Sequence, residues 1–269
     1  MKRLGIIGVG NMGGAIFRGL LNAGYVKPEQ LVVCDMNRAN MEELAEEVSP
    51  DAVYCATAAE VAEQCDTLLL AVKPLHMEET IRSVAPYLEG KSVISIAAGW
   101  TCTMLRDALK DTGATFLRVM PNTPAMAMEG MTALCAEHTL SEADFAFARG
   151  IFDAVGRTVV LPEKQFDGVV AVSGSSPAYV YMLIDAMACA AVKEGIRRDV
   201  AVEMAAQSVL GSALMVLSTG EHPARLRDAV CSPGGTTIDA VAVLEQKGFA
   251  AAVMEAMSAC AEKSRRMAK

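Results

Sequence analysis

The stretch from Leu4 to Gly14 (LGIIGVGNMGG) constrains the fold more than any other part of the chain. A short apolar run leads directly into Gly8, Gly10 and Gly13, and a helical pattern of apolar residues follows. In this setting the spacing G-x-G-x-x-G predicts a strand, a tight turn that brings the backbone close to a pyrophosphate, and a helix packed on the strand. The helix N-terminus adds N–H groups and a partial positive charge. We therefore expect a dinucleotide-binding domain, with a purely structural glycine turn as the alternative.

The choice of dinucleotide depends on the end of the predicted second strand, residues 31–35 (LVVCD). Asp35 lies 22 positions after Gly13, where an acidic residue often accepts hydrogen bonds from the adenosine ribose. Asn37 and Arg38 follow, and an arginine here could instead pair with a 2′-phosphate, or simply open the next helix in contact with solvent. A carboxylate repels a phosphate unless it turns away, so the two signals conflict. We expect a slight preference for NADPH, with NADH possible.

Strand-length apolar runs alternate with helical patterns over the following hundred residues. The runs lie at residues 67–72, 92–98, 115–120, 131–135 and 158–161. The helical patterns lie at residues 58–65, 75–88, 101–110 and 141–155. This alternation predicts an α/β fold with a doubly wound sheet, and such a sheet binds ligands at the carboxyl ends of its strands. Three strand ends there carry AVKP, IAAG and MPNTP.

The character of the chain changes around Pro162, after which strand-like runs disappear. We expect residues 1–162 to form the dinucleotide-binding (Rossmann) domain and residues 163–269 an all-helical domain for dimerisation and substrate binding. Predicted helices lie at residues 178–193, 199–217, 236–246 and 249–267. Several are apolar nearly all round, a pattern typical of helices buried on every side. About a hundred residues cannot easily bury that much helix, so we expect an interlocked homodimer.

Two turns in the helical half are candidate ligand sites. Residues 231–239 (CSPGGTTID) combine a Ser-Pro-Gly-Gly turn with Thr236 and Thr237 at the start of a helix, where N–H groups and hydroxyls could bind a carboxylate. Residues 173–179 (SGSSPAY) likewise place small hydroxyl residues before a helix, and Ser175 or Ser176 could contact a ligand. For each turn, an ordinary helix cap is the alternative.

The composition excludes several classes of protein. A net charge of −8 without a basic stripe, and only 5% aromatic residues, argue against nucleic-acid binding. The N-terminal residues do not resemble a signal peptide, and we expect no membrane span. The eight scattered cysteines indicate reduced, mostly buried thiols of a cytoplasmic protein, and the three histidines show no metal spacing. We therefore expect no metal.

Taken together, five motifs resemble those of the Δ1-pyrroline-5-carboxylate reductase family. They are GVGNMG at 8–13, AVKP at 71–74, MPNTP at 120–124, SGSSPAY at 173–179 and SPGGTT at 232–237. They run in order along essentially the whole chain, and the last is the most specific to the family. The resemblance implies NAD(P)H-dependent reduction of a cyclic imine to L-proline, the last step of proline biosynthesis. It also implies a dimer interlocked through the C-terminal helices, with five dimers forming a decamer in many members.

The resemblance and the motifs together give the expected site. Thr237 is the expected catalytic residue, because it would hydrogen-bond the ring nitrogen. The expected substrate contacts are Ser175, Ser176, Ser232, Gly234, Gly235, Thr236 and Thr237. The expected cofactor contacts are Ile7, Gly8, Val9, Gly10, Asn11, Met12, Asp35, Asn37, Arg38, Ala71, Val72, Lys73, Pro74, Ile96, Ala97, Ala98 and Asn122. Lys73 could instead be an ordinary charged residue at a strand end.

Two other functions stay open on the sequence alone. A related imine or β-hydroxyacid reductase of the same architecture usually needs a catalytic lysine on a helix of the second domain, and Lys193 is the candidate. A non-catalytic NAD(P)-binding regulator would bind the cofactor without turnover, but the second site argues against it.

Overall fold

An eight-stranded sheet forms the centre of the N-terminal part of the computed structural model, which describes residues 2–267. The strand order is β3-β2-β1-β4-β5-β6-β7-β8, and only the β6–β7 pair within this sheet is antiparallel. The strands are β1 (Leu4–Ile7), β2 (Leu31–Cys34), β3 (Val53–Tyr54), β4 (Thr67–Leu70), β5 (Ser92–Ser95), β6 (Thr115–Met120), β7 (Gly130–Cys135) and β8 (Gly156–Leu161). The predicted doubly wound, Rossmann-type sheet is confirmed.

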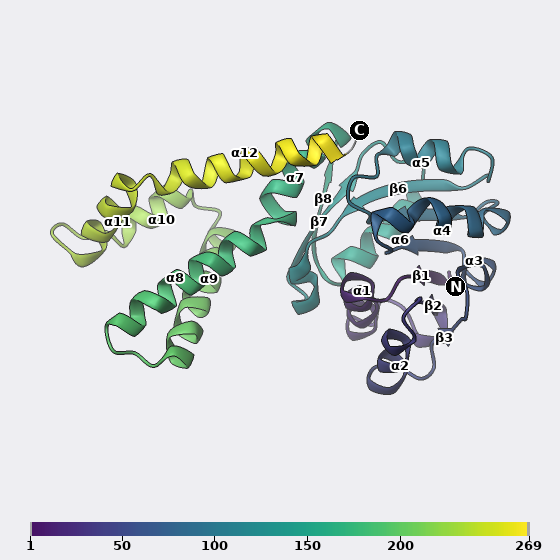
Figure 1. Cartoon of the computed structure of the whole chain (residues 1–269), viewed down its shortest axis with the longest axis horizontal. Helices are drawn as coiled ribbons and strands as arrows, with labels where there is room; N and C mark the ends of the chain where they lie inside the picture. Colours follow the sequence, from purple (N-terminus) through teal and green to yellow (C-terminus); the bar gives the residue numbers. More distant parts are fainter. Residues whose placement is uncertain (1, 268–269) are drawn as a thin grey trace. The chain divides into compact units, whose positions relative to one another are not determined.

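Helices cover both faces of this sheet (Figure 1). One layer contains α1 (Asn11–Asn22), α2 (Arg38–Glu47) and α6 (Glu142–Asp153), and the other contains α3 (Ala58–Gln64), α4 (Met77–Val84) and α5 (Cys102–Leu109). Strand β4 shows why its sequence is a continuous apolar run. Leu68 and Leu70 pack into one layer and Leu69 into the other, so every side chain of the strand's interior is buried.

Strands β4 and β5 end earlier than their apolar runs predicted, at Leu70 and Ser95. Beyond these residues single backbone bonds continue, from Ala71 N–H to the Ile7 carbonyl at 2.9 Å and from Ile96 N–H to the Leu70 carbonyl at 3.2 Å. An apolar run indicates which residues are buried, not which are paired in the sheet. Burial here extends past the last paired residue of each strand.

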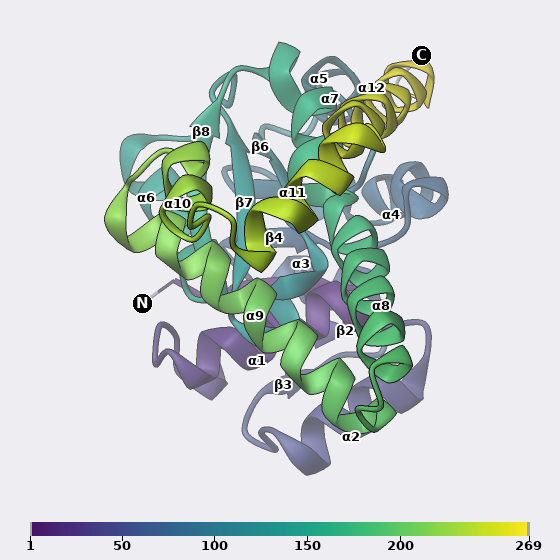
Figure 2. The same cartoon turned by 90° about the vertical axis from the view of Figure 1, so that its left-hand side faces the viewer.

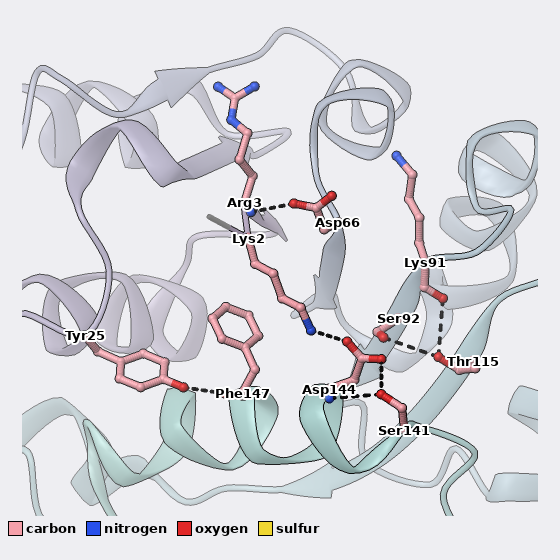
Figure 3. A network of polar contacts seen from close by, with 10 residues as sticks. All are labelled: Lys2, Arg3, Tyr25, Asp66, Lys91, Ser92, Thr115, Ser141, Asp144 and Phe147. Carbon is pink, nitrogen blue, oxygen red and sulfur yellow. Dashed lines mark hydrogen bonds and ion pairs between the residues drawn. The ribbon is translucent and has the colours of Figure 1, made fainter.

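Polar side chains tie the amino ends of the strands together (Figure 3). The Arg3 N–H, just before β1, donates to the Asp66 carboxylate, just before β4, at 2.7 Å. Lys2 forms an ion pair with Asp144 of α6. These contacts fix one edge of the sheet and leave the opposite, carboxyl edge for the glycine turn after β1.

The chain divides into two compact units. One runs from the N-terminus to Gly174 and takes up the chain again from Cys260; the other, the helical unit, is Ser175–Ala259. The domain boundary expected near residue 162 stays a prediction. The later helices are α7 (Phe166–Val169), α8 (Ser176–Lys193), α9 (Arg198–Thr219), α10 (Pro223–Ala229), α11 (Thr236–Gln246) and α12 (Phe249–Met267). Short 3-10 turns lie at Pro28–Gln30, Pro74–His76, Ala85–Tyr87, Thr123–Ala127 and Glu163–Gln165, and a π turn at Val170–Gly174.

Within the helical unit, α8 packs along α9 (Figure 2). Helix α10 was not predicted, because its seven residues are too few for a periodic pattern; its start is marked by Pro223 and by the His222 ring, which accepts from Ala224 N–H. The expected burial of α8 and α9 is not realised within one chain, since Tyr181 is 61% and Met182 73% exposed.

By length and apolar composition alone, the segments Glu163–Lys193 and Arg198–Thr219 could also cross a membrane, whereas no span was expected from the sequence. One or two such helices are weak evidence for a membrane protein, because helices that pack in a soluble assembly have the same composition.

Candidate active site

The glycine turn after β1 has the geometry that a phosphate needs. Gly8 has a φ of +92°, and a Cβ there would lie 2.8 Å from the Ala71 carbonyl oxygen. A Cβ on Gly13 would lie 1.9 Å from the Gly8 carbonyl oxygen, so α1 can approach the turn only without a side chain. A Cβ on Gly10 would meet nothing closer than the Asn40 amide nitrogen at 3.8 Å. The absent side chain of Gly10 therefore leaves room for a ligand rather than for the protein.

Helix α1 begins directly at this turn, at Asn11. No side chain caps its N-terminus, and its first turn contains no acidic residue. The N–H groups there, together with the helix dipole, favour an anion. The residues present thus fit the pyrophosphate of a dinucleotide.

The strand order brings most of the predicted cofactor residues to one edge of the sheet. Ile7 ends β1, residues 71–74 follow β4, residues 96–98 follow β5, and Asn122 follows β6. Because β1, β4, β5 and β6 are parallel neighbours, these segments lie side by side. Sequence reasoning missed Trp100, which is 9% exposed and donates from its indole N–H to the Pro74 carbonyl at 3.2 Å, joining the loops after β4 and β5.

Asp35 joins the turns after β1 and β2. One carboxylate oxygen accepts from Val9 N–H and the other from Asn37 N–H, each at 2.7 Å. The Asn37 side chain caps α2 by accepting from Ala39 N–H, and exposed Arg38 is the first residue of that helix. The carboxylate of Asp35 is thus bound to the backbone on both sides, while no hydrogen bond or ion pair of Arg38 is found among residues 2–267.

A cavity of about 270 Å³ opens beside the turn, lined in part by Val9, Gly10 and Asn11. Sequence reasoning missed the rest of its lining, which is Ala15, Arg18, Asn40, Glu43, Met126 and Met128. Arg18 and Glu43 form an ion pair between α1 and α2 across 25 positions. No local pattern in the sequence signals such a pair.

A partly buried ion pair fixes the loop after β5. Arg118 of β6 donates to the Glu163 carboxylate at 2.6 Å, and the same oxygen accepts from Cys102 N–H, also at 2.6 Å, at the start of α5. Burial alone would raise the pKa of Glu163, but the Cys102 N–H and the Arg118 guanidinium outweigh it and lower that pKa below its ordinary value. The Cys102 thiol lies 3.4 Å from that of Cys135; this contact, followed by burial, raises the pKa of Cys102.

The helical unit carries the second predicted site. Gly235 N–H donates to the Ser232 carbonyl at 3.0 Å, and Gly234 has a φ of +68°. This closes a turn with Pro233 and Gly234 at its two central positions, where a type II turn favours proline and requires a positive φ. Helix α11 follows from Thr236, and no side chain caps it at Gly235. The arrangement presents N–H groups and the hydroxyls of the two threonines near one helix end, as a carboxylate site requires.

The remaining residues that the sequence suggested, two for substrate binding and one as the catalytic lysine of the alternative reductase, lie at the two ends of α8. Ser175 and Ser176 begin α8, with Pro177 in its first turn. Lys193 is the exposed last residue of the same helix.

Comparison with known proteins decides the family. Residues 163–267 match the family described as pyrroline-5-carboxylate reductase dimerisation, and residues 3–99 match the family described as NADP oxidoreductase coenzyme F420-dependent. A pyrroline-5-carboxylate reductase of Escherichia coli (strain K12) is 46% identical over 269 residues, which cover 100% of this chain and 99% of that protein. The chain belongs to the pyrroline-5-carboxylate reductase family.

Other members of the pyrroline-5-carboxylate reductase family match over the same length. The reductase of Synechocystis sp. is 41% identical over 271 residues, covering 99% of this chain and 98% of that protein. Among solved structures, the Plasmodium falciparum pyrroline carboxylate reductase with NADP bound has a TM-score of 0.88 at 31% identity and covers 100% of this chain and 98% of that chain. The Coxiella burnetii reductase has a TM-score of 0.91 at 30% identity and covers 100% of this chain and 99% of that chain.

Proposed function

We propose that the chain reduces the cyclic imine 1-pyrroline-5-carboxylate to L-proline, the last step of proline biosynthesis, with a reduced nicotinamide dinucleotide as hydride donor. The full-length likeness to the reductase of E. coli carries this proposal. The chain is an oxidoreductase that uses NAD(P)H, in keeping with both matched families.

The cofactor residues are proposed from the carboxyl edge of the sheet. The pyrophosphate would lie on the turn of residues 8–12 and at the N-terminus of α1. Residues 71–74 and 96–98, with Ile7 and the backbone of Asn122, would line the rest of the cofactor site. The dinucleotide, when bound, supplies the hydride; the chain binds and orients it.

We favour NADPH over NADH on the geometry at the end of β2. Both oxygens of the Asp35 carboxylate accept from backbone N–H groups, so this carboxylate is partly engaged before any ribose hydroxyl arrives. Asn37 and exposed Arg38 at the start of α2 would contact a 2′-phosphate.

The substrate would bind in the helical unit. Ser232, Gly234, Gly235 and Thr236 would hold its carboxylate, and the Thr237 hydroxyl would hydrogen-bond the ring nitrogen. Ser175 and Ser176 would complete this set. A cyclic imine is basic enough to gain a proton from solvent or a nearby hydroxyl, and the resulting iminium carbon accepts the hydride as the C=N π bond becomes the nitrogen lone pair. Because no strong acid is needed, orienting the two reactants is the main catalytic task, and orientation can contribute ~7–11 kcal/mol.

The assembly is proposed from the apolar helices. The chain self-associates through the matched dimerisation region. We propose a homodimer in which α8 and α9 of one copy cover those of the other, further assembly of dimers into a decamer, a cytoplasmic location, and no insertion into membranes.

The test is the oxidation of NADPH and of NADH at 340 nm with 1-pyrroline-5-carboxylate, each cofactor at limiting concentration. Rapid oxidation with proline formed is expected, with a higher kcat/KM for NADPH. Equal or higher kcat/KM for NADH would reject the assignment of Arg38. Cofactor binding without turnover would instead favour a regulator, or a reductase of another imine or β-hydroxyacid.

A further inference from the structure

The side chain of Asn122 joins two motifs that lie far apart in the sequence. It follows β6, and its amide nitrogen donates to the Ser173 carbonyl, 3.1 Å away and 51 positions later. Its amide oxygen accepts from Met131 N–H, at the start of β7, at 2.8 Å. One amide therefore connects the β6–β7 loop with the first residue of SGSSPAY.

Burial makes this connection specific. Asn122 is 7% and Ser173 8% exposed, so the backbone groups that the amide binds have little access to water. One partner is a donor and the other an acceptor, which requires a side chain with both an acceptor oxygen and an N–H donor in a planar group. An aspartate of the same shape would keep the acceptor but turn a carboxylate oxygen toward the Ser173 carbonyl.

The segment held by Asn122 is the π turn Val170–Gly174. Single π turns are rare in proteins, and those that do occur often lie at functional sites. One further hydrogen bond fixes this turn, from the Ser173 hydroxyl to the Val169 carbonyl at 3.0 Å. The turn also passes close to the end of β6, since a Cβ on Gly174 would come within 3.2 Å of the Met120 methyl group. The turn is thus tied to the same strand end that carries Asn122.

We propose that Asn122 is a positioning residue for the substrate. By fixing the π turn, its amide holds the backbone of residues 173 and 174. Ser175 and Ser176 follow directly in the chain, so we infer that their local backbone geometry depends on this turn. This inference rests on the proposed function, which assigns those two serines to the substrate. The inference differs from the cofactor contact expected of Asn122. Both ends of the side-chain amide bind protein backbone, so the side chain acts on the turn rather than on the cofactor.

Asn122→Asp is the test, measured in the full-length protein by steady-state kinetics and by equilibrium binding of NADPH. The expected result is a fall of about tenfold in kcat/KM for the imine, seen mainly as a higher KM, the equivalent of one lost hydrogen bond. The dissociation constant of NADPH should stay within about twofold of the parent value. Ser173→Ala weakens the same turn by removing one hydroxyl and should shift the same constants in the same direction by less, so the proposal stays testable if Asn122→Asp does not fold.

Gln30→Glu is the matched control. The Gln30 amide also bridges two backbone groups, accepting from Lys27 N–H and donating to the Lys2 carbonyl, each at 2.9 Å, but at the amino edge of the sheet. The Gln30→Glu variant should change the free energy of unfolding without changing the KM for the imine. A rise in the NADPH dissociation constant of Asn122→Asp as large as its fall in kcat/KM would make the Asn122 side chain a cofactor contact and overturn the proposal. A loss of stability with unchanged imine constants would also overturn it. Failure of the parent enzyme to reduce the imine would instead reject the proposed function.

Discussion

The two units of this chain treat their apolar side chains in opposite ways. The N-terminal unit buries both faces of strands β1, β2, β4 and β5, and its helices bury large side chains such as Phe17 and Phe152 completely. The buried residues of the helical unit are small, Ala188, Ala201 and Ala205, while large side chains of α8 and α9 stay in solvent. The first unit is thus complete within one chain, and the second needs another surface. The helical unit falls within the matched dimerisation region, which is consistent with the exposed apolar side chains of α8 and α9 being covered by a second copy of the chain.

The largest effect is expected from a charge on that uncovered surface. Met182→Glu changes a side chain that is 73% exposed in the single chain, so the isolated fold has little to lose. In the proposed dimer the charge would be buried without a partner, at a cost of several kcal/mol, so the dimer dissociation constant should rise at least ~100-fold. Sedimentation at micromolar concentration measures this.

Met104→Glu, on α5 of the N-terminal unit and 39% exposed, is the control and should leave sedimentation unchanged. An unaltered dimer in Met182→Glu would show that α8 does not carry the interface.

A smaller effect, confined to the first unit, is expected from Gly10→Ala. The new methyl group meets no protein atom closer than 3.8 Å, so the fold should be as stable as the parent. It would occupy the space assigned to the pyrophosphate, and the NADPH dissociation constant should rise about tenfold to a hundredfold, or ~1.4–2.8 kcal/mol. Titration calorimetry measures this.

Gly168→Ala, at another glycine with open space around it, should bind NADPH as the parent does. Unchanged binding in Gly10→Ala would remove the turn after β1 from the cofactor site.

The smallest effect on activity, with a clear effect on stability, is expected at the partly buried ion pair of Arg118 and Glu163. Glu163→Gln leaves Arg118 without its counter-charge and should lower the free energy of unfolding at pH 7 by about 1–3 kcal/mol. The folded-state pKa of Glu163 is lowered, so its contribution is complete above the unfolded value of about 4.3 and is lost as pH falls through the folded value. The difference between parent and variant should therefore shrink below about pH 4.

Urea unfolding over this pH range is the measurement. Glu78→Gln, which breaks the exposed pair with Arg82, should cost no more than ~0.5 kcal/mol at any pH. A Glu163→Gln effect that does not change with pH would contradict the assignment.

The sequence predicted those parts of the fold that local pattern controls. The order of most strands and helices, the glycine turn and the bounds of α11 and α12 follow from periodicity and from Gly and Pro positions over a few residues. The short elements β3, α7 and α10 were not predicted. Contacts between distant positions leave no such signal. Asn122 with Ser173 spans 51 positions and Arg118 with Glu163 spans 45, so neither pair was predicted. The exposure of α8 also could not be predicted, because an apolar helix looks the same whether its own chain or another copy covers it.

The central claim is that the N-terminal unit binds the cofactor while the turn before α11 binds the substrate. Thr237→Ala tests it most directly, with kcat/KM for 1-pyrroline-5-carboxylate and the NADPH dissociation constant measured on the same preparation, and with Thr237→Ser as the variant that keeps the hydroxyl. We predict a fall in kcat/KM of about tenfold to a hundredfold in the alanine variant, the range for a hydrogen bond to a charged group, partial recovery in the serine variant, and NADPH binding near the parent value in both. Unchanged catalysis in Thr237→Ala, or a loss of NADPH affinity equal to the loss of catalysis, would contradict this division of the site.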